Sequence, residues 1–230
     1  MRFDVLTLFP ELISSHMDFS IMKRASEDGI IDVIAHNPRD YTLDKHKKVD
    51  DTPYGGGAGM VLMPQPYVDC YEDIRKFENS ITIMMTPQGE PYNDKLSDEF
   101  AKYNQLIIIC GHYEGFDERI REIIKPREIS IGDFVLTGGE LPALCLIDSI
   151  SRKIEGTLGK IESAHDDSFS DGLLEYPQYT KPRNYKGYEV PEVLLNGNHK
   201  HIEEYRLEQK IQRTKIKRPD LYEKWINSHK

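Results

Sequence analysis

The sequence has few cysteines and no long apolar run. Its three cysteines, Cys70, Cys110 and Cys145, are widely spaced, which argues against a disulfide framework and against a zinc motif. The 230 residues contain no stretch of 18 apolar residues, so we expect no membrane span. The N-terminal segment lacks the apolar core and the cleavage site of a signal peptide. These absences favour a cytoplasmic protein whose cysteines are small buried apolar side chains.

Positive charge is also scarce. The chain has 30 Lys and Arg against 39 Asp and Glu, a net charge of −9, which taken alone is unfavourable for binding nucleic acid. The charge is unevenly distributed, because residues 181–230 hold 12 Lys and Arg and 7 Asp and Glu, a net of +5, and residues 1–180 carry −14. Four tyrosines between residues 176 and 188 lie among the first of these basic residues. This pattern suits RNA, although a solvated helix face explains it equally well.

Apolar segments alternate with segments of helical periodicity over the first two thirds of the chain. Strands are predicted at residues 2–9, 30–36, 81–86, 106–110 and 129–136. Helices are predicted at residues 10–25 and 139–154 and around Tyr67 and Phe100. The order predicts an α/β fold with a mostly parallel sheet and crossover connections.

The periodicity is lost after the helix that ends near residue 154. The next residues are rich in Gly, Ser and charge, which is typical of a linker. Beyond it, Asn198 is a predicted N-cap of a helix that runs to about Lys217, and Pro219 begins another. We therefore expect three parts: a first domain of residues 1–159, a flexible linker of residues 160–172 and a small helical domain of residues 173–230.

Glycines gather in four turns, three of which directly follow predicted strands. The turns are residues 54–59, 86–89, 110–115 and 136–142. Strand ends of this kind converge on ligands in α/β sheets, although each glycine can also serve only a tight turn. None of the turns matches a dinucleotide fingerprint or a P-loop, and the strand-end turns lack Lys and Arg. This favours an adenosine-type ligand without phosphates.

Two features suggest acid–base chemistry. The linker region carries the carboxylates of Glu162, Asp166, Asp167, Asp171 and Glu175 next to His165. A solvated polar loop is the simplest interpretation of these residues. A metal site formed by neighbouring residues is a weaker interpretation. The more specific hypothesis is that one of the carboxylates acts as a general base. Arg152 ends the apolar helix and is either a solvated cation at a helix C-terminus or a donor to a developing negative charge.

A set of ordered motifs covers essentially the whole chain. The motifs are Leu8-Phe9-Pro10-Glu11, Pro38-Arg39-Asp40, residues 49–57, Pro87-Gln88-Gly89, residues 110–115 with Asp117-Glu118-Arg119, Ser130-Ile131-Gly132-Asp133, residues 136–142, Asp167-Ser168-Phe169, Gly172-Leu173-Leu174 and Gly197-Asn198-His199. On these motifs the chain resembles the bacterial tRNA (guanine-37-N1)-methyltransferases, the TrmD family of the SPOUT superfamily.

This resemblance implies a fold and a reaction. The fold is a SPOUT-type α/β domain with a deep trefoil knot, a rare exception to the rule against threaded loops, and a small helical C-terminal domain that binds tRNA. The reaction transfers a methyl group from S-adenosylmethionine to N1 of guanine 37, next to the anticodon. The enzyme is expected to be a homodimer with shared active sites. Some family members respond to Mg²⁺, but the sequence offers no residues to assign to a metal site.

The resemblance also assigns residues. Asp167 matches the general base and Arg152 the arginine that stabilises the guanine, and we expect the linker to become ordered only with tRNA and the partner subunit. The residues expected to bind the methyl donor are Pro87, Gly89, Gly111, Tyr113, Glu114, Ile131, Gly132, Asp133, Phe134, Val135, Leu136, Gly138, Gly139 and Pro142. The chain departs from the family at Asp166, where Glu is frequent, and at His112, where Arg is frequent.

Two alternatives remain at the level of sequence. A catalytically silent RNA-binding protein with this fold would have no need of both Arg152 and Asp167. An enzyme of the same superfamily that modifies a different base would not be expected to carry this C-terminal domain.

Overall fold

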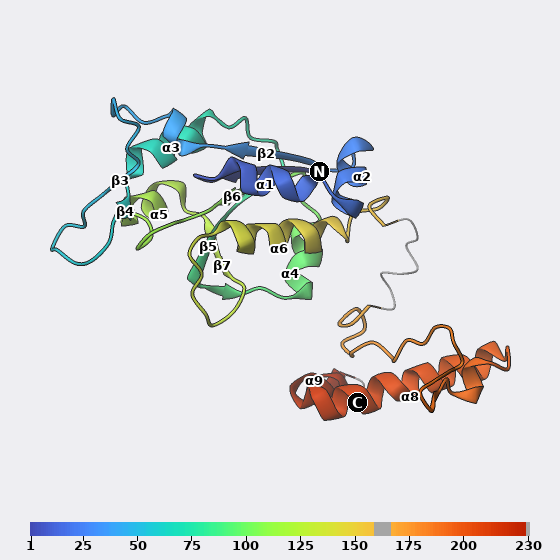
Figure 1. Ribbon diagram of the computed structural model, residues 1–230. Coiled ribbons are helices and arrows are strands. Elements are labelled where there is room, and N and C mark those ends of the chain that lie inside the picture. Colours follow the sequence, from blue (N-terminus) through green and yellow to red (C-terminus); the bar gives the residue numbers. More distant parts are fainter. Residues whose placement is uncertain (159–166, 229–230) are drawn as a thin grey trace. The chain divides into compact units, whose positions relative to one another are not determined.

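The computed structural model of the protein describes residues 1–158 and 167–228. The chain divides into two compact units, Met1–Gly159 and Lys160–Lys230, and each is described by itself. The described residues contain eight α-helices and one five-stranded sheet (Figure 1). No helix among them is long and apolar enough to cross a membrane.

The first unit is built on a parallel sheet. Its strands are β1 (Arg2–Leu6), β2 (Asp32–His36), β5 (Ser80–Pro91), β6 (Gln105–Ile109) and β7 (Arg127–Ser130), in the order β2-β1-β6-β5-β7. Every neighbouring pair is parallel. The helices between and after them are α1 (Pro10–Met17), α2 (Ser20–Glu27), α3 (Pro64–Asp73), α4 (Asp94–Phe100), α5 (Glu118–Ile124) and α6 (Glu140–Ser151). The predicted α/β class and the mostly parallel sheet are therefore confirmed.

Helices cover both faces of the sheet. Alternate residues of a strand point to opposite faces, so Phe3 and Val5 of β1 pack with α1, α2, α4 and α6, whereas Leu6 packs with α3 and α5. All five residues of the central strand β6 are buried. Burial on both faces explains why β6 is, after Gln105, a continuous apolar run without an alternating polar pattern.

Four predicted elements were wrong in their extent. The strand expected at residues 2–9 ends at Leu6, and the strand expected at residues 81–86 runs on to Pro91. The single helix expected at residues 10–25 is two helices, because Asp18 and Phe19 separate α1 from α2 and Ser20 takes a φ of +53°. The strand expected at residues 129–136 ends at Ser130. There the Ser130 hydroxyl accepts a hydrogen bond from the Gly132 amide, which turns the chain out of the sheet. The residues after Ser130 form a loop that reaches α6.

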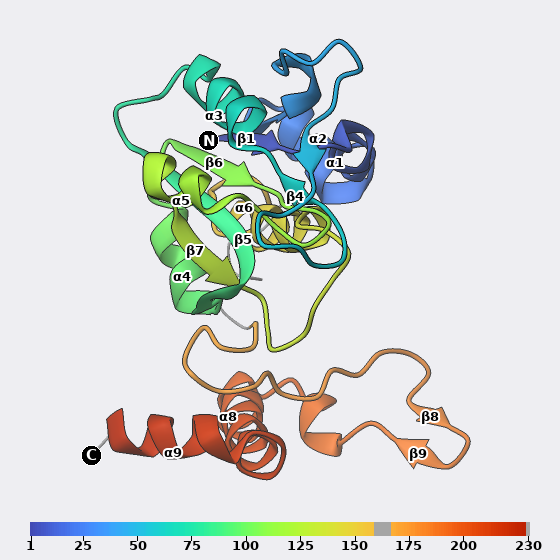
Figure 2. The ribbon, with the colours of Figure 1, turned by 90° about the vertical axis from the view of Figure 1, so that its left-hand side faces the viewer.

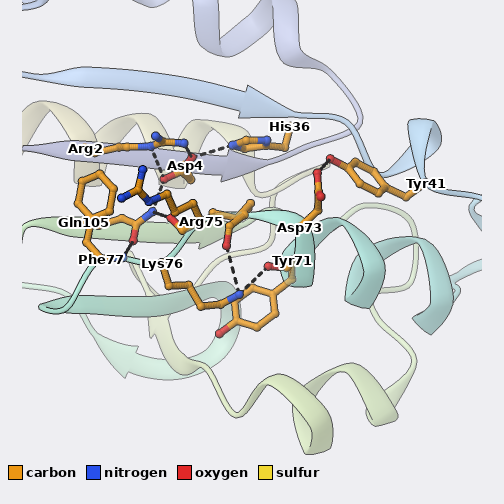
Figure 3. A network of polar contacts seen from close by, with 11 residues as sticks. Arg2, Asp4, His36, Tyr41, Tyr71, Asp73, Arg75, Lys76, Phe77 and Gln105 are labelled. Carbon is orange, nitrogen blue, oxygen red and sulfur yellow. Dashed lines mark hydrogen bonds and ion pairs between the residues drawn. The ribbon is translucent and has the colours of Figure 1, made fainter.

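A buried polar network crosses three strands of the sheet (Figure 3). The Asp4 carboxylate has no exposed surface and accepts hydrogen bonds from Arg2 (2.7 and 2.9 Å) and from the Gln105 amide (2.7 Å). Its Oδ1 also lies 2.7 Å from His36 Nε2. Burial acts to raise the pKa of Asp4, but the hydrogen bonds from His36, Arg2 and Gln105 outweigh it, so the pKa lies below its ordinary value.

Short elements complete the first unit. They are the 3₁₀ helix η1 (Pro38–Asp40) and the antiparallel pair β3 (Asp50–Asp51) and β4 (Val61–Leu62). This pair encloses the Gly-rich turn of residues 55–59. Gly59 has a φ of +81°, and a Cβ there would lie 2.3 Å from the Glu114 carboxylate. Glycine at this position therefore lets the turn lie directly against Glu114.

The second unit is mainly helical. It contains a short hairpin, β8 (Asn184–Tyr185) and β9 (Tyr188–Glu189), visible in Figure 2, followed by η2 (Glu192–Leu194), α8 (His199–Lys217) and α9 (Pro219–Ser228). The predicted N-cap is confirmed, because the Asn198 side chain accepts from the His201 amide. Residues 171–176 are held on α8 by an ion pair between Asp171 and Lys210 and by a hydrogen bond from the Leu174 amide to the Thr214 hydroxyl, 2.9 Å.

Candidate active site

Three loops at the carboxyl ends of neighbouring strands enclose a cavity of about 270 Å³. The first loop, residues 86–89, bulges out of β5, since Met85 and Glu90 both pair with Ile129. The second, residues 111–115, follows β6, and the third, residues 131–139, joins β7 to α6. The cavity thus lies where parallel α/β sheets bind their ligands.

Most of the residues predicted to bind the methyl donor line this cavity. They are Pro87, Gly111, Tyr113, Glu114, Ile131, Gly132, Phe134, Val135, Leu136, Gly138, Gly139 and Pro142. The described residues Gly89 and Asp133 are outside the lining. A Cβ on Gly89 would lie 2.4 Å from the backbone of Glu128 and Ile129, so this glycine lets the first loop approach β7.

Backbone contacts hold the second and third loops together. The Gly139 amide donates to the Gly111 carbonyl at 2.9 Å, and His112 forms an isolated β-bridge with Gly138. A Cβ on Gly139 would lie 2.8 Å from Cys110 Cα, and one on Gly138 would lie 2.2 Å from His112 Nε2. Only glycine permits this close approach, so the two turns form a single wall of the cavity.

A buried carboxylate, that of Glu140, contacts a residue of this wall. Glu140 begins α6 and is almost fully buried, and its Oε1 accepts a hydrogen bond of 2.7 Å from the Thr7 hydroxyl. Its Oε2 lies 2.9 Å from Nε2 of His112, a residue of the lining. The His112 ring also packs against Phe9, with ring centroids 4.7 Å apart. The sequence placed His112 and Glu140 in motifs but did not predict that they contact each other.

Other residues of the lining were not predicted. They are Met85, Thr86, Gln88, His112, Gly115, Phe116, Arg121, Ile129, Ser130 and Thr137. Five of them, Thr86, Gln88, His112, Gly115 and Thr137, lie within the glycine turns that the sequence indicated, and Met85 and Phe116 directly adjoin those turns. Arg121 comes from α5 and is engaged in ion pairs with Glu118 at 2.9 Å and Glu128 at 3.1 Å. Its charge is therefore already balanced at the edge of the cavity.

The thiol behind the cavity is unsuited to nucleophilic chemistry. Cys110 is fully buried, and burial, with the nearby Glu140 carboxylate, raises the pKa of its thiol well above the ordinary value. A thiol with such a pKa stays protonated at neutral pH. The interpretation of the cysteines as buried apolar side chains is confirmed for Cys110 and Cys70 and wrong for Cys145, which is exposed.

Arg152 lies at the opposite end of α6 from the cavity. It is the C-cap residue, whereas Gly139 and Pro142 line the cavity near the helix N-terminus. A helix of 12 residues is about 18 Å long, so Arg152 is not part of its own chain's cavity.

Asp167 belongs to the second unit and begins a compact turn. Its carbonyl accepts from the Ser170 hydroxyl at 2.8 Å, and the Phe169 amide donates to the Leu173 carbonyl at 2.7 Å. His165 and Asp166 lie outside the described residues, as does most of the predicted linker, including its expected ordering with tRNA. Among the described residues, no group of His, Cys, Asp and Glu side chains is arranged to hold a metal ion.

Comparison with known proteins gives the family. The profile of the family described as tRNA (Guanine-1)-methyltransferase TrmD matches residues 1–224. Similar curated relatives are the tRNA (guanine-N(1)-)-methyltransferases of Lachnospira eligens, 55% identical over 100% of this chain and 98% of the relative, and of Clostridioides difficile, 56% identical over 97% and 98%. That of Staphylococcus epidermidis is 54% identical over 98% and 92%. The chain belongs to the tRNA (guanine-1)-methyltransferase family.

Membership of the tRNA (guanine-1)-methyltransferase family implies S-adenosylmethionine as the methyl donor, and the cavity fits that molecule. Its lining supplies apolar surface from Ile131, Leu136 and Pro142 and close-packed glycine backbone, which suit an adenosine without phosphates. Glu114 supplies a carboxylate, which suits a ligand that carries positive charge.

Proposed function

We propose that this chain transfers a methyl group from S-adenosylmethionine to N1 of guanine 37 in tRNA, next to the anticodon. The observation that supports this most is the cavity at the ends of β5, β6 and β7, formed by glycine backbone and apolar side chains in a chain of this family. A tRNA substrate also supports a cytoplasmic location.

The donor half of the site consists of residues of the first unit. Ile131, Leu136 and Pro142 would pack against the adenosine, and the Gly111–Gly139 contact fixes the wall. The Glu114 carboxylate would balance the positive charge of the donor. When bound, S-adenosylmethionine supplies an electrophilic methyl group.

The guanine half needs a base and a cation. Guanine N1 carries a proton, so it becomes a nucleophile only when that proton is removed, and the Asp167 carboxylate accepts it. Negative charge then develops toward O6, where the Arg152 guanidinium donates a hydrogen bond. Holding guanine and methyl group in line supplies much of the remaining rate.

The position of Arg152 supports a homodimer with shared active sites. Arg152 is about 15 Å along α6 from Pro142, the nearest residue of that helix in its own cavity, so we infer that it serves a guanine beside a donor held by a second chain. The family also implies a trefoil knot. The turns at Gly111 and Gly139 pack directly on each other, as the loops of such a knot would.

The second unit is proposed to bind the tRNA. Its last 50 residues carry 12 Lys and Arg against 7 Asp and Glu, and tyrosines precede α8. Excess positive charge neutralises phosphates, and exposed aromatic rings stack on unpaired bases.

Substitution of the two proposed catalytic residues tests the mechanism. Asp167→Asn should abolish methyl transfer from labelled S-adenosylmethionine to tRNA, and Arg152→Ala should lower kcat by about 100-fold or more. Both should bind the donor normally in calorimetry, since neither residue lines the cavity. Asp166→Asn is the matched control and should stay active. Undiminished transfer by Asp167→Asn, or equal loss in Asp166→Asn, would show that Asp167 is not the base.

A further inference from the structure

The second unit contains a cavity of its own, of about 410 Å³. It is enclosed by the extended segment 176–183, by Val190 and Leu194 near η2 and by the first turns of α8. All its walls belong to one unit, so its shape is independent of how the two units are arranged. Its volume lies within the range of small-molecule sites in proteins.

Aromatic and cationic side chains dominate the mouth and walls of this cavity. Tyr176 is buried, whereas Tyr179 is 47% exposed. Burial and the neighbouring Tyr179 phenol raise the pKa of the Tyr205 phenol in α8. Lys181 and Arg183 are exposed cations of the same lining, and no carboxylate belongs to it.

Arg206 is a partly buried cation of the cavity. Its guanidinium carbon lies 4.5 Å from the centre of the Tyr176 ring, within the distance of a cation–π contact. Its Nε is buried, yet it makes no hydrogen bond to any residue that the structure describes. A buried donor without an acceptor is unfavourable in a folded protein unless a ligand supplies one.

We propose that this cavity binds one unpaired nucleotide of the tRNA substrate, with its base on the tyrosine rings and its phosphate near Arg206 and Lys181. Tyrosine faces stack on any base, and the guanidinium of Arg206 matches the charge and the acceptors of a phosphate. A metal ion or a free anion fits this cavity less well than a nucleotide, because neither would pack against the apolar side chains of Val190 and Leu194. The inference rests on the proposed function, since it takes tRNA as the substrate.

Binding and kinetics of the full-length protein test this. Tyr179→Leu keeps an apolar side chain but removes the ring, and Arg206→Gln removes the charge. Each should raise the Kd for an RNA hairpin with the anticodon stem and loop, and the KM for tRNA, by about tenfold, as expected when one stacked base or one phosphate contact is lost. The kcat at saturating tRNA and the Kd for S-adenosylmethionine should stay unchanged, as should the Kd for a fully paired RNA duplex of the same length.

Matched controls separate the cavity from the general charge of this unit. Tyr222→Leu and Arg213→Gln change an α9 tyrosine and an α8 arginine outside the lining and should shift the hairpin Kd less than about twofold. If a thermal melt shows that the Arg206→Gln variant is not folded, the hairpin Kd of Tyr179→Leu and of the exposed variant Lys181→Ala tests the proposal instead.

Three results would overturn the inference: an unchanged hairpin Kd in the cavity variants, an equal loss in the controls, or an equal loss for the duplex. A wild-type protein that neither binds nor methylates tRNA would instead overturn the proposed function itself.

Discussion

At the scale of single residues, Asp4 shows how the sheet tolerates a buried charge. Its carboxylate is inaccessible to solvent, and both oxygens are occupied by Arg2, His36 and Gln105 (Figure 3). Gln105 accepts in turn from the Phe77 amide at 2.7 Å, which ties the segment after α3 to the central strand. Removing one member of such a network leaves its partners buried and unpaired.

Asp4→Asn should therefore destabilise the protein. We expect the free energy of unfolding at pH 7 to fall by about 2–3 kcal/mol, as for other broken buried pairs. The pKa of Asp4 is below that of an unfolded aspartate, so its contribution is complete at neutral pH and disappears as the pH falls through the folded-state pKa. Urea unfolding at pH 7 and at a pH well below the ordinary aspartate pKa of about 3.9 measures this. The exposed Glu72→Gln should change little, and a gap between wild type and Asp4→Asn that persists in acid would refute the account.

At the scale of elements, the glycine turns determine where the cavity forms. Gly139 is buried, and the backbone of Cys110 and Gly111 occupies the space that a side chain would need. The contact joins the loop after β6 to the start of α6, so the wall and the helix are positioned together.

Gly139→Ala should damage both stability and donor binding. The obstacle is backbone, which cannot turn away, so we expect a loss of about 1–3 kcal/mol and at least a tenfold weaker Kd for S-adenosylmethionine. Gly187→Ala is the control, because no atom lies within 4 Å of its Cβ although its φ is +86°. It should lose about 1 kcal/mol and bind the donor normally. Calorimetry that finds normal donor binding in Gly139→Ala would contradict this role.

The sequence predicted the types of the main elements better than their ends. Buried apolar runs such as residues 106–110 identify strands on their own, because burial on both faces leaves only apolar residues. The break at Phe19 and the end of β7 at Ser130 depend on a backbone turn and a side-chain hydrogen bond, which periodicity does not reveal. Likewise, glycines at 111 and 139 indicated a site, but their mutual contact exists only in the folded chain.

At the scale of the whole molecule, the net charge of −9 conceals two opposite parts. The last 50 residues carry a net +5 and the rest −14. Acidic residues far from the RNA contribute little when salt screens them, so the basic part governs association.

The affinity for tRNA should accordingly fall with salt. Raising the salt from 50 to 200 mM should weaken the Kd for tRNA by at least about tenfold, because neutralised phosphates release counterions. Binding of S-adenosylmethionine in the largely apolar cavity of the first unit is the internal control and should change far less. Filter binding or fluorescence anisotropy at several salt concentrations gives the slope. A tRNA affinity independent of salt would contradict this view of the charge.

The central claim is methyl transfer to N1 of guanine 37. The most direct measurement incubates the full-length protein with labelled S-adenosylmethionine and two tRNA transcripts that differ only in having G or A at position 37, followed by nucleoside analysis. We expect N1-methylguanosine from the first transcript and no incorporation of the labelled methyl group into the second. Equal labelling of both transcripts, or no labelling of the first, would contradict it.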